Sequence, residues 1–486
     1  MNGEILSILT WTLTAAIFVT TIVVVAVVIS ENRNPVRSLA WVTVLLVAPV
    51  IGLFLYFIFG RDIKNKRAAL SRNLKRKLKK RERSVKPNID RMPFSEKSLG
   101  IIRMADSVCS ATVHFNNSAK IFDSGKEKFD SLFKDLENAK NYIFVQYYII
   151  GNDETGQKLA QLLMKKAREG VKVHLIYDPV GSASSGKKFF KEMAAAGINV
   201  KPFMLVRFPI FGTRINWRNH RKQVVIDGSI AYVGGMNVAD RYITGGKNFD
   251  SWRDIHVRVT GPIVLGVQRS FITDWSFMSS KTDELPEADF NIDIHKIYPS
   301  DDDKLLTMQL VRSGPTSQWY NIELIYLKAI SSARQRVYLE TPYFLPTEGL
   351  LNALQTASLS GVDVRILIPY KSDSPILTLA SASYIAECLR AGIKVYRYTP
   401  GMLHSKMLII DDELVSIGST NFDFRSFEHN FELTMLIYST EFNQQATEIF
   451  RRGLTQAERV NAADWATRGR MTRMKESLTR LFAPIL

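Results

Sequence analysis

The sequence predicts an α/β fold in which two similar halves follow a pair of membrane helices. Three observations carry this prediction: charge-free stretches near the N-terminus, helix and strand patterns that alternate twice in the same order, and a motif that occurs once in each half. Alternating helices and buried strands are typical of helices packed on both faces of a sheet. We therefore expect two repeated α/β/α sandwich domains with mixed sheets, preceded by two transmembrane helices.

Residues 5–30 and 38–60 contain no charged side chain. Each stretch exceeds the ~20 residues that a helix needs to cross the hydrocarbon core of a bilayer. The first stretch lacks the basic start and the small-residue cleavage site of a signal peptide. We expect transmembrane helices at about 5–30 and 38–60, so that residues 1–60 form the membrane part. A buried core helix is the alternative interpretation.

Basic residues are concentrated directly after the second stretch. Residues 61–91 hold 14 Lys and Arg against 3 Asp and Glu, which is most of the chain's net charge of +17. The positive-inside rule places this segment in the cytoplasm. Basic residues near a membrane attract anionic lipid by ~1 kcal/mol each. We expect 61–100 to be a basic juxtamembrane linker that contacts anionic membrane lipid, with a solvated linker that has no partner as the alternative.

The remainder is expected to form two domains, 101–300 and 301–486. In the first, helix patterns precede two strand patterns, NYIFVQYYI and VKVHLIYD, and in the second the same order leads to RVYLETPYF and VDVRILIPY. The polar, acidic stretch 283–303 places the boundary near residue 300. Two cysteines, Cys109 and Cys388, indicate a reducing compartment without disulfides. Apolar residues at helical spacing in the C-terminal RMTRMKESLTRLFAPIL are expected to pack on the second domain, with membrane contact as the alternative.

Two segments of the chain share one motif. The first reads HRKQVVIDGSIAYVGGMN from His220 to Asn237, and the second reads HSKMLIIDDELVSIGSTN from His404 to Asn421. In both, Lys follows His by two residues, Asp by seven, a Gly-Gly or Gly-Ser pair by fourteen and fifteen, and Asn by seventeen. Shared offsets of this kind indicate a duplicated unit. A strand places residues i and i+2 on one face, so each His and its Lys project together from one arm of a hairpin.

Imidazole, ammonium and amide groups in this pattern point to phosphoryl chemistry, in which charge on the phosphate oxygens must be stabilised. One imidazole can attack phosphorus while the other protonates the leaving alcohol, and the residues alone leave open which does which. No metal or other cofactor is expected. The catalytic candidates are the motif residues His220, Lys222, Asp227, His404, Lys406 and Asp411. The offset of seven turns both Asp side chains off the His/Lys face, which favours a structural role in the turn for them.

A catalytic imidazole needs an acceptor that holds its second ring nitrogen. Each motif is followed by one carboxylate in a strand-like run, Asp254 after His220 and Glu432 after His404. We expect each of these carboxylates to orient a histidine, and the similar placement in the two halves suggests a pairing within each half. The alternative is that both are ordinary carboxylates on a solvated strand face.

At these residues the chain resembles the phospholipase D superfamily, whose signature HxK(x4)D(x6)G(G/S)xN is present twice. Within it, the chain is similar to bacterial cardiolipin synthases with two N-terminal membrane helices, through NPVRSLAWVTVLLVAPVIGLFLYFIFGR, NYIFVQYYI, YTPGMLHSKMLIIDD and RLFAPIL. The resemblance implies phospholipase D-like domains, a phosphohistidine at His220 and an acid/base at His404. It also implies a set of groups around the phosphate oxygens, namely Lys222, Lys406, Asn237, Asn421 and, nearby, Ser419. The first motif has Gly235 in place of that serine.

The resemblance further implies an enzyme of the bacterial cell membrane that transfers a phosphatidyl group between two phosphatidylglycerol molecules, giving cardiolipin and glycerol. Hydrolysis of a lipid or nucleic acid by the same intermediate is the main alternative, and a scaffold without activity is a second. The membrane stretches favour lipid, and the weak basicity outside 61–91 argues against nucleic acid. GSASSGKK at 181–188 lacks the Ser or Thr of a nucleotide-binding loop. The sequence does not indicate an oligomeric state.

Overall fold

The computed structural model describes residues 2–30, 35–56, 94–204, 217–246, 248–279, 286–288 and 305–485. The chain divides into two compact units. The first unit holds the N-terminal helices, and the second holds the described residues from 94 onward apart from Trp217. Each unit is described by itself.

The first unit contains α1 (Asn2–Ser30), α2 (Pro35–Val47) and α3 (Pro49–Leu55). Among the described residues, α1 alone is long and apolar enough to cross a membrane. The expected single helix over 38–60 is wrong, because the helix ends at Val47 and Ala48 leaves the helical region with φ −135° and ψ 71°. Proline explains the break, since it has no N–H and disfavours a helical residue before it. Residues 57–60 lie outside the described residues.

The helix α3 approaches α2 closely at Gly52, where a Cβ atom would lie 2.8 Å from the carbonyl oxygen of Val44. A small buried cluster forms beside this contact, and the ring of Trp41 meets that of Tyr56 edge-on at 5.5 Å. Its buried members are Val24, Val28, Leu45 and Tyr56. The first unit therefore has an apolar core of its own. The basic segment 61–91 lies outside the described residues.

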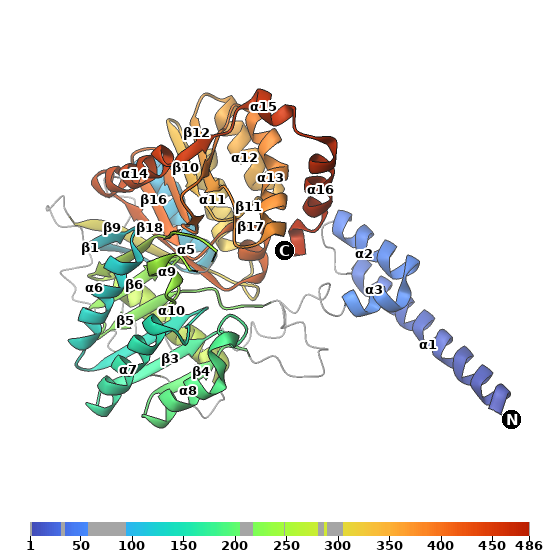
Figure 1. Ribbon diagram of the computed structural model, residues 1–486, viewed down its shortest axis with the longest axis horizontal. Coiled ribbons are helices and arrows are strands. Elements are labelled where there is room, and N and C mark those ends of the chain that lie inside the picture. Colours follow the sequence, from blue (N-terminus) through green and yellow to red (C-terminus); the bar gives the residue numbers. More distant parts are fainter. Residues whose placement is uncertain are drawn as a thin grey trace. The chain divides into compact units, whose positions relative to one another are not determined.

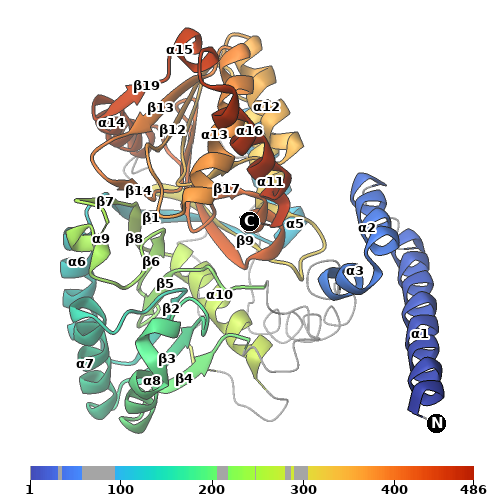
Figure 2. The ribbon, with the colours of Figure 1, turned by 45° about the vertical axis from the view of Figure 1, so that its right-hand side comes forward.

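The second unit is built on one mixed sheet of 15 strands, in which two sets of strands run outward from a central antiparallel pair (Figures 1 and 2). From the centre, the first half has β1 (Val113–Phe122), β8 (His256–Thr260), β6 (Ile230–Gly234), β5 (Gln223–Ile226), β2 (Tyr142–Tyr147), β3 (Lys172–Tyr177) and β4 (Asn199–Pro202). The second half has β9 (Leu306–Ser313), β18 (Glu432–Tyr438), β16 (Leu414–Gly418), β15 (Met407–Ile410), β10 (Arg336–Glu340), β12 (Asp363–Pro369), β13 (Lys394–Tyr398) and β19 (Ala457–Arg459). The order and direction of pairing repeat, so the predicted duplication of an α/β unit is confirmed.

Helices cover both faces of each half. In the first half these are α6 (Gly125–Glu137), α7 (Glu154–Arg168), α8 (Gly186–Ala195), α9 (Arg241–Thr244) and α10 (Ile263–Met278). In the second half they are α11 (Asn321–Ser331), α12 (Glu348–Leu359), α13 (Pro375–Arg390) and α14 (Thr440–Thr455), followed by α15 (Ala462–Ala466) and α16 (Arg470–Leu481). The alternation of strand residues explains the layers.

On β2, Ile143 and Val145 lie in the buried cluster with α6, α7 and α8, whereas the ring of Phe144 stacks at 4.7 Å on that of Phe271 from α10. On β10, Tyr338 stacks at 4.8 Å on Phe450 of α14, and its strand neighbours face α11, α12 and α13. Each half is therefore an α/β/α sandwich, as the sequence predicts, but the two sandwiches share a single sheet.

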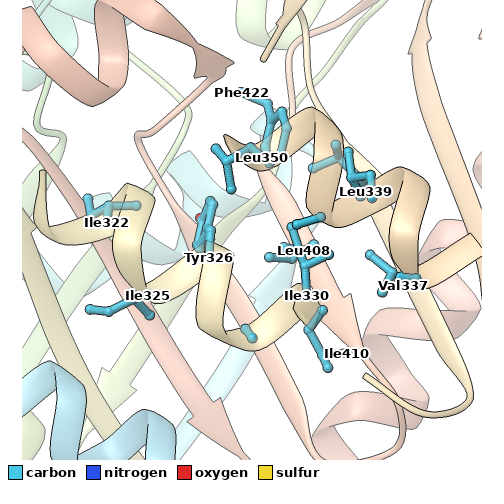
Figure 3. Close-up of a cluster of buried hydrophobic side chains, with 14 of the residues drawn as sticks. Ile322, Ile325, Tyr326, Ile330, Val337, Leu339, Leu350, Leu408, Ile410 and Phe422 are labelled. Atoms are coloured by element: carbon cyan, nitrogen blue, oxygen red, sulfur yellow. The ribbon is translucent and has the colours of Figure 1, made fainter. Parts of the chain in front are cut away.

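The core of the second half also receives residues from before the first half. Figure 3 shows its centre, where side chains of α11, β10, α12 and β15 meet. The helix α5 (Glu96–Cys109), capped by the Ser95 hydroxyl, packs against α11 and β9 and adds Ile101 and Ile102 to the same cluster. A helix therefore begins inside the segment 61–100 that was expected to be a linker. The expected boundary at residue 300 lies outside the described residues, and the domain limits stay predictions.

The C-terminal helix α16 packs on α13, but its apolar residues face away from the protein. Met474 and Leu478 are exposed, while Glu476 on the opposite side is buried and forms a two-bond ion pair with Arg468. The expected docking of this segment on the second domain is therefore confirmed, but its apolar residues do not make the contact. Arg480 pairs with Glu387 of α13, so the polar side of α16 makes the contact with the second domain.

We predict that Leu350→Ala lowers the free energy of unfolding by about 2–5 kcal/mol, because the side chain is fully buried in the cluster of Figure 3 and its removal leaves a cavity. The matched control is Leu359→Ala at the end of the same helix, where the side chain is 73% exposed and the change should stay within ~0.5 kcal/mol. Denaturant unfolding of both variants measures the difference. Equal effects would contradict the assignment of this core.

Candidate active site

Each motif forms a β-hairpin, as its spacing predicts. β5 and β6 flank the turn at Asp227, and β15 and β16 flank the turn at Asp411; both Asp residues have φ 50°. The His of each motif lies just before the first strand of its hairpin. The structure therefore places both histidines at the same end of their hairpins.

Each half supplies the backbone hydrogen-bond acceptor for the motif histidine of the other half. The backbone N–H of His220 donates to the carbonyl of Phe431, at 3.0 Å, and that of His404 donates to the carbonyl of Arg253, at 2.7 Å. A short parallel pair, β14 (Met402–Leu403) with β7 (Trp252–Arg253), continues the second contact. Each histidine is thus fixed by backbone from the opposite half, next to that half's carboxylate.

The side chains cross in the same way. His220 Nδ1 lies 2.8 Å from Glu432 Oε1, and His404 Nδ1 lies 2.6 Å from Asp254 Oδ2. Both carboxylates therefore contact a histidine, but the expected pairing within each half is wrong. The physical reason is the backbone exchange, which brings the start of β18 to His220 and the residue after β7 to His404. Because Nδ1 is engaged in both rings, Nε2 is the nitrogen available to a ligand.

Both motif lysines are buried next to their histidines. Lys222 Nζ donates to the His220 carbonyl at 2.6 Å, and Lys406 Nζ lies 2.8 Å from His404 Nδ1 and 3.9 Å from Asp254 Oδ2. Burial lowers the pKa of Lys406 to about 8, although Asp254 opposes the change, and burial lowers the pKa of Lys222 well below its usual range. An anion bound nearby would favour the charged form of both lysines again.

The two histidine–carboxylate pairs differ at one motif position. The Ser419 hydroxyl donates to Glu432 Oε2, whereas the equivalent Gly235 offers no donor, and a Cβ there would lie 2.1 Å from Asp254 Oδ1. Burial raises the pKa of Asp254 to about 6. Burial also acts to raise the pKa of Glu432, but His220, Lys222 and the Ser419 hydroxyl together lower it. Glu432 is therefore the more strongly ionised carboxylate, and a proton is held more readily by the Asp254–His404 pair.

The surroundings of both histidines make them poor bases. Burial lowers the pKa of His220 to about 4 against the opposing charge of Glu432, and burial together with Lys406 lowers the pKa of His404 well below its usual range. A neutral imidazole is the nucleophilic form. An entering phosphodiester anion would favour the protonated form of His404 again.

Asp227 and Asp411, included above with the catalytic candidates, point away from the histidines. Asp227 accepts the backbone N–H groups of residues 140–142 at 2.7–2.9 Å. Asp411 accepts those of residues 334–336 and the ammonium of Lys97. Each carboxylate ties its hairpin turn to the start of the neighbouring strand. The structural interpretation of the offset therefore holds, and their inclusion with the catalytic residues is corrected.

Both histidines line one cavity of about 260 Å³. Asn237 and Asn421 also line it. The Asn237 amide is engaged by the Ile149 N–H and the Tyr242 hydroxyl, whereas Asn421 Oδ1 is buried without a hydrogen bond among the described residues. Ser419 contacts Glu432 and is absent from the lining. The two motifs therefore meet at one cavity, as the sequence predicts.

The cavity has charged residues that the sequence did not single out. Arg218 and Arg425 line the cavity with Tyr148, whose ring lies 5.2 Å from that of His220. Burial raises the pKa of Tyr148, and the two guanidinium groups oppose this change. Asp373 accepts from the Tyr343 hydroxyl at 2.6 Å, and Asp423 accepts from the Ser426 N–H at 2.7 Å.

Only some of the charged residues of the cavity could have been found from the sequence. Arg241 and Arg425 each follow the motif Asn by four positions, so extending the repeat would have found them. Asp423 falls where the first half has Ala239, and Asp373 follows a loop without a motif, so neither carries a repeat signal. Within the described ranges, no group of three or more His, Cys, Asp and Glu is arranged to hold a metal ion.

Comparison with known proteins agrees with the fold. Over 81% of this chain and all of the other, the structure resembles the crystal structure of phosphatidylserine synthase from Haemophilus influenzae Rd KW20, with a TM-score of 0.57 and 13% identity, which is a likeness of fold. A duplicated His–Lys–Asn motif on two such sandwiches defines a phospholipase D-like enzyme.

The sequence comparisons show to which family of phospholipase D-like enzymes the chain belongs. Residues 132–275 and 326–454 match the family described as "Cardiolipin synthase, PLD-like domain", and residues 18–61 match "Phospholipase_D-nuclease N-terminal". The chain is 38% identical to the cardiolipin synthase of Geobacillus sp. strain WCH70, over 96% of this chain and 92% of that protein. It is 38% identical to the major cardiolipin synthase ClsA of Bacillus subtilis strain 168, over 95% and 96%. The chain therefore belongs to the cardiolipin synthase family of phospholipase D-like enzymes.

We predict that Gly235→Ala removes at least 99% of activity, roughly the ~2.7 kcal/mol that loss of one positioned catalytic contact costs. The added methyl group would displace Asp254 from His404. Gly349→Ala, at a helical glycine with open space around it, is the matched control and should leave turnover unchanged. Turnover per folded protein measures both. A fully active Gly235→Ala enzyme would show that the Asp254–His404 contact is dispensable.

Proposed function

We propose that this enzyme joins two phosphatidylglycerol molecules into cardiolipin and glycerol through a phosphohistidine at His220. The observation that supports it most is the single cavity lined by both histidines, each held at Nδ1 by a carboxylate and backed by a buried lysine. The chain aligns with the two cardiolipin synthases named above over nearly their whole length. Phosphatidylglycerol, an anion, suits a cavity backed by Lys222 and Lys406.

In the first step, His220 Nε2 attacks phosphorus, the bond to the glycerol oxygen breaks, and His404 gives that oxygen its proton. In the second step, a hydroxyl of another phosphatidylglycerol loses its proton to His404 and attacks phosphorus, and the bond to His220 breaks. One phosphodiester replaces another, so no energy-rich donor is required. Lys222 and Lys406 stabilise the charge on the phosphate oxygens in both steps.

The difference between the two carboxylates supports these roles. His220, Lys222 and the Ser419 hydroxyl keep Glu432 ionised, so that it accepts the one proton of a neutral His220 at Nδ1 and leaves Nε2 free to attack. Asp254, which has no such hydroxyl donor, shares a proton with His404. A nucleophile needs the first environment and a general acid the second. The sequence difference between Ser419 and Gly235 is thus a physical basis for unequal histidines.

The lining carboxylates suit a glycerol headgroup. Asp373 and Asp423 both line the cavity and oppose the lowering of the Lys406 pKa by burial, so they lie on the side of the cavity near Lys406. Carboxylates accept hydrogen bonds from hydroxyl groups, which the leaving glycerol and the incoming acceptor both carry. Hydrolysis to phosphatidic acid would result if water took the acceptor's place.

We further propose that the enzyme lies in the bacterial cell membrane with its catalytic halves in the cytoplasm. The long apolar α1 supports one membrane span, and the broken segment after Pro35 would supply the second. The excess of basic residues in 61–91 supports the orientation. Anionic lipid attracted by this segment would raise the local concentration of substrate.

The direct test uses purified enzyme in vesicles of phosphatidylglycerol without added metal or nucleotide. We predict that glycerol and cardiolipin appear in equal amounts and that His220→Ala or His404→Ala lowers the rate by at least about 10³-fold. Thin-layer chromatography separates cardiolipin from phosphatidic acid. Phosphatidic acid as the main product would establish a hydrolase instead, and full activity of both variants would refute the site.

The pH dependence of kcat/KM tests the assignment of the proton. His220 must be neutral, so activity is lost on the acid side only near its pKa of about 4. The Asp254–His404 pair must hold a proton, so activity also falls as the pH rises through about 6. A phosphatidyl-p-nitrophenol donor serves as control: its leaving group needs no proton, and the alkaline loss should disappear. An alkaline loss that persists with this donor would contradict the assignment.

A further inference from the structure

The C-terminal helix α16 presents an apolar stripe to solvent. Five large apolar side chains lie on it at helical spacing, with exposed fractions of 60% for Met471, 51% for Met474, 52% for Leu478, 75% for Leu481 and 53% for Phe482. At 3.6 residues per turn they occupy one face about 100° wide. The other exposed large apolar side chains of the described second unit, such as Leu359 and Val180, come from separate parts of the sequence. A cluster of this kind marks a contact surface.

Basic side chains border the stripe. Arg470 and Lys475 lie on either side of it on the helical wheel, and Arg473 lies further round; all three are exposed and form no ion pair among the described residues. The acidic residue of the helix, Glu476, is buried and neutralised by Arg468. The exposed surface of α16 is therefore apolar in the middle and positive at the edges. This is the pattern of a helix that lies in a membrane interface.

The stripe is held outward by polar contacts on the opposite side. The Arg480 guanidinium pairs with Glu387 and lies 4.2 Å from the ring centre of Tyr384, both on α13, and Ala483 enters the core of the second half. The same helix α13 reaches the catalytic cavity through Leu377. The helix α13 therefore connects α16 with one wall of the cavity, so lipid bound at α16 would lie near that wall.

We propose that α16 lies in the headgroup region of an anionic membrane and fixes the catalytic cavity against the lipid surface. The occupant of the stripe is lipid, because its basic borders complement anionic headgroups and would repel the same borders on a second copy of the chain. The chain also carries α1, which is long and apolar enough to cross a membrane, so the second unit works close to a bilayer. Met, Leu and Phe side chains enter the acyl boundary while Arg and Lys reach the phosphates.

The full-length protein in vesicles of phosphatidylglycerol and phosphatidylcholine provides the test. A nitroxide is attached at Leu478→Cys in the stripe or, as control, at Thr472→Cys on the polar side of α16, each with Cys109→Ser. We expect the label at 478 to be relaxed by oxygen dissolved in lipid and the label at 472 by a water-soluble nickel complex. Replacing phosphatidylglycerol with phosphatidylcholine should move the label at 478 towards water.

Equal exposure of both labels to the nickel complex would overturn the proposal. Dipolar broadening between labels at 478 would overturn it in favour of a second copy, and an unchanged signal in pure phosphatidylcholine would overturn the anionic part. None of these readouts requires activity, so they decide the proposal even if the proposed function fails.

Activity gives a second arm, which rests on the proposed function. Leu478→Glu should lower turnover of vesicle phosphatidylglycerol about tenfold and change turnover of dispersed short-chain phosphatidylglycerol by less than about twofold. The matched control Leu359→Glu, at a leucine on α12 that is even more exposed than Leu478, should alter neither rate. A parallel loss on both substrates would mean that α16 acts on the cavity itself, against the proposal.

Discussion

The active site depends on an exchange between the two halves of the catalytic unit. Each motif histidine takes its backbone hydrogen bond and its orienting carboxylate from the half to which it does not belong. Neither half alone contains a complete histidine–carboxylate pair. The continuous sheet, joined at β1 and β9, holds the halves in the register that this exchange needs. The shared sheet that joins the two halves therefore also completes the active site.

The duplication supplies the parts, and small departures from it supply the unequal roles. Ser419 occupies the position that Gly235 has in the first half, and its hydroxyl joins His220 and Lys222 in lowering the pKa of Glu432. Asp423 replaces Ala239, which adds a carboxylate to the side of the cavity near Lys406. Two copies of a symmetric site would hold two equal bases, whereas an attack on phosphorus with a proton donated opposite needs a neutral and a protonated imidazole. The two histidine–carboxylate pairs therefore have similar geometry, and single residues that differ between the halves make their protonation unequal.

The sequence predicted the repeat, the hairpins and the meeting of the motifs, because periodicity and turn residues are local signals. It failed where long-range contacts decide. The partner of His220 is Glu432 and not Asp254, since strand exchange between distant segments leaves no mark on spacing. The single helix predicted over 38–60 is instead broken before Pro49, a local signal that the prediction from the absence of charge did not use. The apolar spacing at the C-terminus correctly predicts the helix α16. The side of the helix that faces the protein is set by the ion pair of Arg480 with Glu387, two residues far apart in the sequence.

The exchange of carboxylates is tested most directly by comparing Asp254→Asn with Glu432→Gln on phosphatidyl-p-nitrophenol, whose leaving group needs no proton. The account predicts that Asp254→Asn, which disables the acid/base His404, still releases a burst of nitrophenol and stalls with the phosphatidyl group on His220. Glu432→Gln, which leaves His220 without its acceptor, should lose the burst. A burst retained by Glu432→Gln and lost by Asp254→Asn would show that each carboxylate serves the histidine of its own half and would contradict the account.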